Sequence, residues 1–193
     1  MPLSAPAPRE HIHTRRIECT GYLRQDGLWD IEGTLEDTKT YAFENRERGA
    51  IEPGDPIHGM KVRITVDDAF VIQAVEAVSD KTPFAVCKEV APNFQRLVGV
   101  TIGPGFRGEV KRRVGGVEGC THLVELFGPL ATTAFQTIYP YRNRQASRDR
   151  PEGTATATRR PSLLDTCHAF RSDGAKVKEL WPDHWRDPAA AKG

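Results

Sequence analysis

The stretch that decides the fold is Gly115-Gly-Val-Glu-Gly-Cys-Thr-His-Leu-Val-Glu-Leu-Phe-Gly-Pro-Leu-Ala-Thr-Thr-Ala-Phe-Gln-Thr-Ile138. From Leu123 onwards, apolar residues recur at steps of three and four, which predicts an amphipathic helix over residues 120–138. Pro129 lies inside this helix and predicts a kink or an unusual turn there. The broad apolar stripe indicates that the helix packs against the core of a domain.

Upstream of this helix, apolar and polar residues alternate in steps of two, which is typical of antiparallel strands. Residues 11–35 show this pattern on both sides of Asp26-Gly27, a dipeptide that favours a hairpin turn. A second hairpin is expected to turn at Asp67-Asp68, after a loop over residues 44–59. The sequence therefore predicts about four antiparallel strands before the helix.

The remaining segments complete the predicted fold. Residues 83–98 and 106–114 have helical spacing, so two or three helices are expected in all. Residues 163–181 contain Asp173-Gly174 and are expected to form a final hairpin. The predicted fold class is α+β, an antiparallel β-meander with two or three helices packed on one face and a C-terminal hairpin.

The chain of 193 residues is long enough for one domain with a substantial core. We expect a flexible arm over residues 1–10, a single globular domain over residues 11–185 and a tail over residues 186–193. Residues 142–161 are rich in Arg, Thr, Ser and Pro, and are expected to be a mobile segment of the domain.

Composition excludes several functions. A net charge of +1 gives no electrostatic argument for nucleic-acid binding. No apolar run approaches the roughly 20 residues that span a bilayer, and the start of the chain does not resemble a signal peptide. Four widely spaced cysteines are too few for a disulfide scaffold, so free thiols and a cytoplasmic protein are expected. Open sheet edges and the N-terminal arm favour a homodimer.

The clearest functional signal is Cys120-Thr-His122, which follows a glycine-rich loop and starts the long helix. A helix N-terminus offers free N–H donors and partial positive charge, which favour thiolates and other anions. An imidazole there can move protons near neutral pH, and Glu125 lies three residues on, where it could orient the ring. A buried cysteine with a locally packed histidine is the structural alternative.

The expected first hairpin and its continuation carry a second group of candidates. His11, His13 and Arg15 alternate, so they share one face of a strand and could bind a carboxylate or a phenolate. A solvated strand edge is the alternative. Three side chains at the end of the next strand could act as an acid, as a base or as a binding group for an anion: Asp37, Lys39 and Tyr41. A hydrophilic turn is the alternative. Aromatic residues that could line a substrate pocket, unless they pack in the core, include Trp29 and Phe106.

Cysteines and histidines offer a different kind of site. Thiols and imidazoles are ligands of zinc and iron, and five such side chains could converge: Cys87, Cys120, His122, Cys167 and His168. Their spacings are long and no C-x-x-C occurs, so separate structural thiols are the alternative.

Several motifs together resemble a bacterial family known as a domain of unknown function. They are His11-x-His13-x-Arg-Arg, Gly27-Leu-Trp-Asp-Ile-Glu-Gly33, Asp37-Thr-Lys39, Gly119-Cys-Thr-His-Leu123, Ala131-Thr-Thr-Ala-Phe-Gln136 and Asp165-Thr-Cys-His168. The resemblance covers almost the whole chain. It implies a place in the catabolism of lignin-derived aromatic compounds, where small lyases such as phenylcoumaran γ-formaldehyde lyases remove a hydroxymethyl carbon from aromatic dimers as formaldehyde.

On this resemblance we expect a carbon–carbon lyase that acts on a small aromatic substrate by acid/base chemistry, without a cofactor. His122 is the expected base. The other expected catalytic residues are Cys120, Glu125, Lys39 and Tyr41, and the expected substrate contacts are His11, His13, Arg15, Trp29, Asp37 and Phe106.

A second resemblance, to iron–sulfur cluster scaffold proteins, covers about residues 15–138. It implies a metal or cluster carrier that holds zinc or iron through Cys87, Cys120 and His122, with Asp37 as a carboxylate partner. The chain departs from that pattern because its pair is Cys-x-His rather than adjacent His-Cys. The lyase and the carrier are therefore the two main functional hypotheses, and an accessory domain with structural cysteines and histidines is the third.

Overall fold

The computed structural model of this chain describes residues 2–148 and 160–188. The chain divides into two compact units, Met1–Ser147 and Arg148–Gly193, and each is described by itself. The expected single domain over residues 11–185 stays a prediction. Within the described ranges, no helix is both long enough and apolar enough to cross a membrane.

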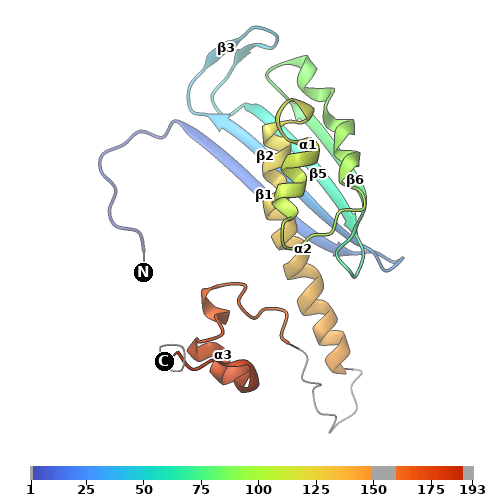
Figure 1. Cartoon of the computed structure of the whole chain (residues 1–193). Coiled ribbons are helices and arrows are strands. Elements are labelled where there is room, and N and C mark those ends of the chain that lie inside the picture. Colours follow the sequence, from blue (N-terminus) through green and yellow to red (C-terminus); the bar gives the residue numbers. More distant parts are fainter. Residues whose placement is uncertain (1, 149–159, 189–193) are drawn as a thin grey trace. The chain divides into compact units, whose positions relative to one another are not determined.

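A four-stranded antiparallel sheet is the framework of the first unit (Figure 1). Its strands, in spatial order, are β1 (His13–Leu23), β2 (Trp29–Lys39), β5 (Pro56–Val66) and β6 (Ile72–Lys81). The turn between β1 and β2 contains Gly27 with φ of +85°, a conformation that glycine adopts at little steric cost. Both hairpins expected from the alternating pattern are confirmed, and so is the α+β fold class.

The prediction of a loop over residues 44–59 is largely wrong. A small second sheet lies there, made of β3 (Phe43–Asn45) and β4 (Gly49–Ile51), and β5 already begins at Pro56. A proline is tolerated as the first residue of a strand because its missing N–H is not needed there. The earlier start of β5 adds His58 to the sheet.

Helices cover one face of this sheet (Figure 1). The α-helices are α1 (Phe106–Val114) and α2 (Thr121–Arg148), and the 3₁₀ helices are η1 (Ala85–Lys88), η2 (Ala91–Leu97) and η3 (Gly116–Glu118). The single helix expected over residues 83–98 is therefore two short 3₁₀ helices, whereas the other two expected helices are confirmed. Buried side chains of α2 and of the sheet share one core, including Leu123, Leu126, Leu130, Ile31, Leu35 and Ile64.

Two glycines allow α2 to lie directly against the sheet. A Cβ at Gly33 on β2 would lie 3.0 Å from Cδ2 of Leu130, and a Cβ at Gly21 on β1 would overlap the side chain of Thr137. Glycine is required at such close approaches because any larger residue would push the helix away. The contact sets the height of α2 above β1 and β2.

α2 runs past its expected end at residue 138 and contains two prolines, Pro129 and Pro140. Each proline removes the N–H that would bond to the carbonyl four residues earlier, which belongs to Glu125 or to Gln136. Both of these residues are exposed, so water can satisfy the two carbonyls. The prolines are thus accommodated without ending the helix.

The second unit is helical where a hairpin was expected. It contains η4 (His168–Phe170), α3 (Ala175–Leu180) and η5 (Pro182–His184), so the C-terminal hairpin is wrong. α3 consists mainly of good helix formers, and Gly174 precedes it as the N-cap residue instead of turning between strands.

Part of the chain that was expected to be mobile or frayed lies outside the described residues. Residues 142–148 belong to α2, whereas residues 149–159 and 189–193 are outside the described ranges. Residues 2–10 of the expected arm form no helix or strand, and all are exposed.

Candidate functional site

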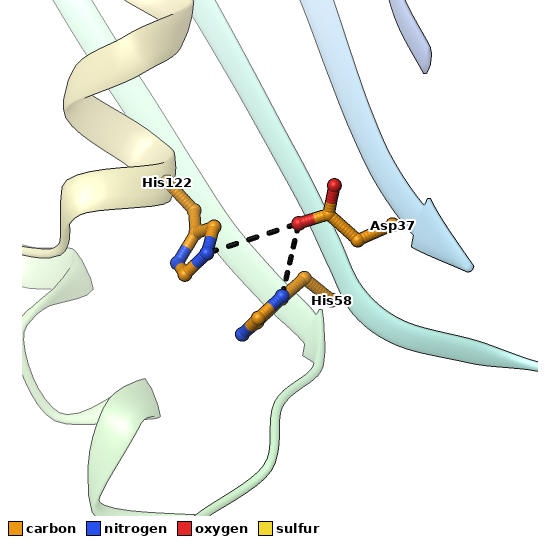
Figure 2. A group of neighbouring side chains, drawn as sticks. All are labelled: Asp37, His58 and His122. Atoms are coloured by element: carbon orange, nitrogen blue, oxygen red, sulfur yellow. Dashed lines mark hydrogen bonds and ion pairs between the residues drawn. The ribbon is translucent and has the colours of Figure 1, made fainter. Parts of the chain in front are cut away.

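Three neighbouring strands place polar side chains in one row on the face that α2 covers. Arg15 on β1 lies opposite Asp37 on β2, and Asp37 lies opposite His58 on β5. Directly opposed residues in antiparallel strands point to the same face of a sheet. The first turn of α2 brings His122 over this row, and the side chains of Asp37, His58 and His122 converge (Figure 2).

Asp37 is the centre of this group and is only 1% exposed. Its Oδ1 accepts a hydrogen bond from Nε of Arg15 at 2.8 Å and lies 3.3 Å from Nε2 of His13. Its Oδ2 accepts hydrogen bonds from Nη2 of Arg15 at 2.8 Å and from Nδ1 of His58 at 3.0 Å. Nε2 of His122 lies 3.8 Å from the same oxygen. We call these five residues the Asp37 cluster.

Asp37 remains ionised in spite of its burial. Burial raises the pKa of Asp37, but the hydrogen bonds and charge of Arg15, and then those of His58, bring this pKa below its usual value. The same bidentate pair raises the pKa of Arg15. The cluster therefore contains a fixed carboxylate and a fixed guanidinium around which the imidazoles are arranged.

The rings of His58 and His122 lie face to face, with centroids 3.6 Å apart and 26° between the ring planes. Burial lowers the pKa of His58, and the hydrogen bond with Asp37 offsets only part of that effect. Burial, followed by the charge of His58, lowers the pKa of His122. Both imidazoles are therefore neutral near pH 7. Because Nδ1 of His58 donates to Asp37, its Nε2 keeps a lone pair that can accept a proton.

Cys120 reaches the Asp37 cluster through His122. Its Sγ lies 3.7 Å from Nδ1 of His122, and its carbonyl accepts the first helical hydrogen bond, from the N–H of Val124. The glycine-rich loop that precedes it has a structural role, because a Cβ at Gly119 would overlap the carbonyl of Val114. The predicted thiol and imidazole are thus neighbours at the start of α2.

Lys39 and Tyr41 form a pair that continues β2 beyond Asp37. Nζ of Lys39 donates a hydrogen bond to the hydroxyl of Tyr41 at 3.0 Å. The same amine lies 5.0 Å from the ring centroid of Tyr41 and 5.8 Å from that of Phe43. An amine held beside a phenol and over aromatic rings can bind a phenolate or carboxylate of a ligand.

Glu125 lies on a different flank of α2. It lines a pocket of about 450 Å³ between α1 and α2, whose walls include Arg107 and Lys111 but no residue of the Asp37 cluster. Among the described residues, no hydrogen bond or ion pair joins Glu125 to His122. Its negative charge nevertheless acts to raise the pKa of His122 and of Arg15, so it influences the cluster electrostatically.

Three expected substrate contacts lie apart from this centre. Nε2 of His11 is hydrogen-bonded to the hydroxyl of Thr14 at 2.8 Å. Trp29 is 3% exposed and starts β2, at the opposite end of the strand from Asp37. Phe106 starts α1 and is 4% exposed. Both aromatic side chains belong to the hydrophobic core.

The structure gathers a different set of potential metal ligands from the one expected. Within the described ranges, the histidine, cysteine and acidic side chains whose ligand atoms all lie within 4.8 Å of one another are Asp37, His58 and His122. Cys87 lies in η1 and is not part of this group, while Cys167 and His168 belong to the second unit. All four cysteines are free thiols.

His58 is the member of the Asp37 cluster that the sequence analysis missed. The loop expected over residues 44–59 hides the start of β5. A signal is present nevertheless, because His58 continues the alternation of Met60, Val62 and Ile64 along the buried face of this strand. Extending that period of two towards the N-terminus places His58 on the core side of the sheet.

Comparison with known families supports the coarser part of the resemblance drawn from the motifs, a family of unknown function, over residues 13–136 rather than almost the whole chain. The family model described as "Protein of unknown function (DUF2889)" matches residues 13–136, so the chain belongs to this family. The match includes every residue of the Asp37 cluster. No curated protein and no solved structure gives a significant match to the chain.

Proposed function

We propose that this DUF2889 protein is a lyase for small lignin-derived aromatic compounds, which cleaves a carbon–carbon bond and releases formaldehyde. One observation carries the acid/base part: the buried carboxylate of Asp37 binds Nδ1 of His58 and leaves Nε2 as a proton acceptor. A carboxylate that orients a neutral imidazole in this way is the usual support of a general base. The substrate class comes from the resemblance of the sequence motifs to enzymes of aromatic catabolism.

The proposed reaction requires a base, a leaving group and a proton donor. In the substrate, a hydroxymethyl group is attached to a carbon whose neighbour carries an aryl ether. Nε2 of His58 takes the hydroxyl proton, the C–O bond becomes the carbonyl of formaldehyde, and the adjacent carbon–carbon bond breaks. Its electron pair forms a carbon–carbon double bond and expels the aryl oxygen as a phenolate. The phenolate regains the proton, so atoms, electrons and charge balance without an oxidant or a reductant.

Other side chains near Asp37 support this scheme. His122 is stacked on His58, so the protonation of one ring disfavours that of the other, since two imidazoles in face contact are costly to charge together. Arg15 is committed to the carboxylate through both of its hydrogen bonds and acts as a positioning residue. Lys39 and Tyr41 stabilise the leaving phenolate.

Formaldehyde release from a hydroxymethyl-bearing phenylcoumaran dimer tests the proposal. The purified protein is incubated with the dimer. Released formaldehyde is trapped as a coloured adduct, and the new double bond is followed by its ultraviolet absorbance. We expect turnover by the wild type, and a fall in kcat of about 10²–10⁴-fold in His58→Gln, the usual contribution of a general base. His122→Gln is expected to lower kcat as well.

His11→Gln is the matched control, because His11 is an exposed histidine whose ring bonds to Thr14 rather than to Asp37. It should retain activity within about twofold. If His58→Gln and His122→Gln both turn over the dimer at the wild-type rate, neither histidine is the general base. A folded wild type that releases no formaldehyde from a set of such dimers would overturn the assigned reaction.

Metal binding is the second candidate function, because Asp37, His58 and His122 offer three ligand atoms within 4.8 Å of one another. The position of Arg15 argues against a metal site, since its guanidinium is hydrogen-bonded to both oxygens of Asp37 and repels a cation. Elemental analysis of untagged protein purified without chelator distinguishes the two. About one zinc or iron per chain, lost in His122→Ala and kept in Cys87→Ala, would favour a metal site at Asp37.

We also propose that the protein works in the cytoplasm, because all four of its cysteines are free thiols. The proposed partner is a small aromatic substrate, and neither nucleic acid nor a membrane has a part in the scheme.

A further inference from the structure

The outer edge of β1 has no partner strand within the described part of the chain, because β1 is the first strand of the order β1, β2, β5, β6. It pairs with β2 over eleven residue pairs without a bulge. Soluble proteins usually protect such an edge with lysine, proline, a bulge or a short strand. β1 contains neither lysine nor proline, and the two charged side chains on its outer face, Arg16 and Glu18, are of opposite sign. Its free N–H and C=O groups are therefore available to a further strand.

The side chains along this edge carry a pattern of their own. Arg16 and Glu18 are exposed and are two residues apart on the face turned away from α2. Neither makes a hydrogen bond or an ion pair with another described residue. The same face ends in two exposed apolar side chains, Ile12 at 44% and Tyr22 at 49%. In order along this face lie Ile12, Thr14, Arg16, Glu18, Thr20 and Tyr22, so the two opposite charges are at its centre.

We propose that β1 pairs antiparallel with β1 of a second copy of this chain, in the register that sets Ile17 opposite the partner's Ile17. This register places Arg16 opposite the partner's Glu18, and by symmetry the same ion pair forms twice. It also places Ile12 opposite the partner's Tyr22. Opposite charges and apolar pairs directly across two strands stabilise their pairing.

Neighbouring registers are unfavourable. A shift of the symmetry centre by one residue in one direction sets Arg16 opposite the partner's Arg16. A shift in the other direction sets Glu18 opposite the partner's Glu18. Like charges directly opposite each other destabilise a strand pair. Each of these shifts moves the pairing by two residues. A shift of the pairing by one residue would instead turn the inner face of one copy outward. The charges of β1 therefore favour the register centred on Ile17 over both adjacent symmetric registers.

Pairing in this register would also complete the edge of the Asp37 cluster. Arg15 and His13, whose side chains are 37% and 42% exposed, lie on the inner face of β1. They would stand opposite the partner's Cys19 and the partner's Gly21. A neighbouring strand there shields the ion pair between Arg15 and Asp37 from water, which strengthens it. This strand pairing follows from the geometry and charge of β1 and is independent of the proposed reaction.

Light scattering coupled to size exclusion tests the pairing on the full chain. Between about 1 and 100 µM, the wild type should reach twice the 21.5 kDa mass of one chain. Arg16→Glu and Glu18→Arg should each weaken the dimer at least about tenfold, because each sets two like charges opposite each other. The double variant restores both ion pairs and should return to within about threefold of the wild type. Arg46→Glu, an exposed charge between β3 and β4, is the control and should change nothing.

Cysteine crosslinking locates the contact independently of affinity. In a background in which the four native cysteines are replaced by serine, Ile17→Cys should form a disulfide-linked dimer under mild oxidation. Val78→Cys, at a 39% exposed position on the opposite edge strand β6, should not. A monomeric wild type at 100 µM would overturn the proposal. So would a dimer that survives both single charge reversals, or one that crosslinks at residue 78 and not at residue 17.

Discussion

Replacing Asp37 by asparagine tests whether the buried carboxylate organises its surroundings. Asparagine offers one acceptor oxygen where Asp37 has two, and its NH₂ group is a donor. Whichever way the amide is turned, one of the two 2.8 Å contacts with Arg15 becomes a donor facing a donor. A hydrogen bond to a charged group contributes about 1.5–3 kcal/mol.

The expected magnitude follows from the exposure of Arg15. This side chain is 37% exposed, so water recovers part of the lost hydrogen bonding of the guanidinium. We therefore expect Asp37→Asn to lower the free energy of unfolding by about 2 kcal/mol at pH 7. For a chain of this size, that corresponds to a fall in Tm of about 4–8 °C.

Urea unfolding followed by Trp29 fluorescence measures this loss. Trp29 is 3% exposed in the first unit, and Trp181→Phe with Trp185→Phe removes the two signals of the second unit. Asp80→Asn is the matched control, because Asp80 pairs with Lys61 at 2.7 Å but is 43% exposed. Loss of such an exposed pair should cost about 0.5 kcal/mol or less.

The pH dependence gives a second check on Asp37. Its pKa is lowered in the folded state, so its contribution is present above the unfolded-state value of 3.8 and is lost as the pH falls through the folded-state pKa. The difference between wild type and Asp37→Asn should be full at pH 7 and should shrink below pH 3.8. A difference at pH 7 no larger than that of Asp80→Asn would refute the reasoning.

Two further predictions concern packing and protonation. Gly33→Ala should lower the free energy of unfolding by about 1–3 kcal/mol, because its Cβ would meet Leu130 at 3.0 Å. Gly108→Ala in α1, with no atom within 4 Å of the added Cβ, should raise it by about 0.5–1 kcal/mol, and urea midpoints compare the two. The pKa values of His58 and His122 are lowered in the folded state, so the unfolded chain binds more protons than the folded chain below pH 6.5. The free energy of unfolding therefore decreases as the pH is lowered through this range. His58→Gln should therefore lose less stability than wild type between about pH 7.5 and 5.5, and an equal loss would contradict this assignment.

The parts of the fold that were predictable are those that local sequence determines. The first hairpin follows from alternation around Asp26-Gly27, and the start of α2 follows from its apolar stripe. The same dipeptide type at Asp173-Gly174 misled the prediction, because Asp-Gly can precede a helix as well as turn between strands. Only the residues that follow, which are helix formers in α3, distinguish the two outcomes.

The part of the candidate site that lies on the first hairpin could be predicted from the register of that hairpin. Arg15 and Asp37 are each eleven residues from Asp26, so a tight turn centred there already sets them opposite each other. The two residues belong to separate sequence motifs, and only the register of the hairpin connects them. His58 and His122 come from segments joined to this hairpin only by β5 pairing and by the packing of α2, which no local period specifies.

The row formed by Arg15, Asp37 and His58 implies that the site can be divided and reassembled. β1 is joined to β2 by hydrogen bonds and by the exposed turn at Asp26-Gly27. A chain opened in this turn leaves Arg15 and His13 on the shorter fragment and the rest of the Asp37 cluster on the longer one. Adding the short fragment as a free peptide then restores the missing guanidinium. The edge strand can thus be exchanged, and the state of the site reports whether the peptide has inserted into the sheet.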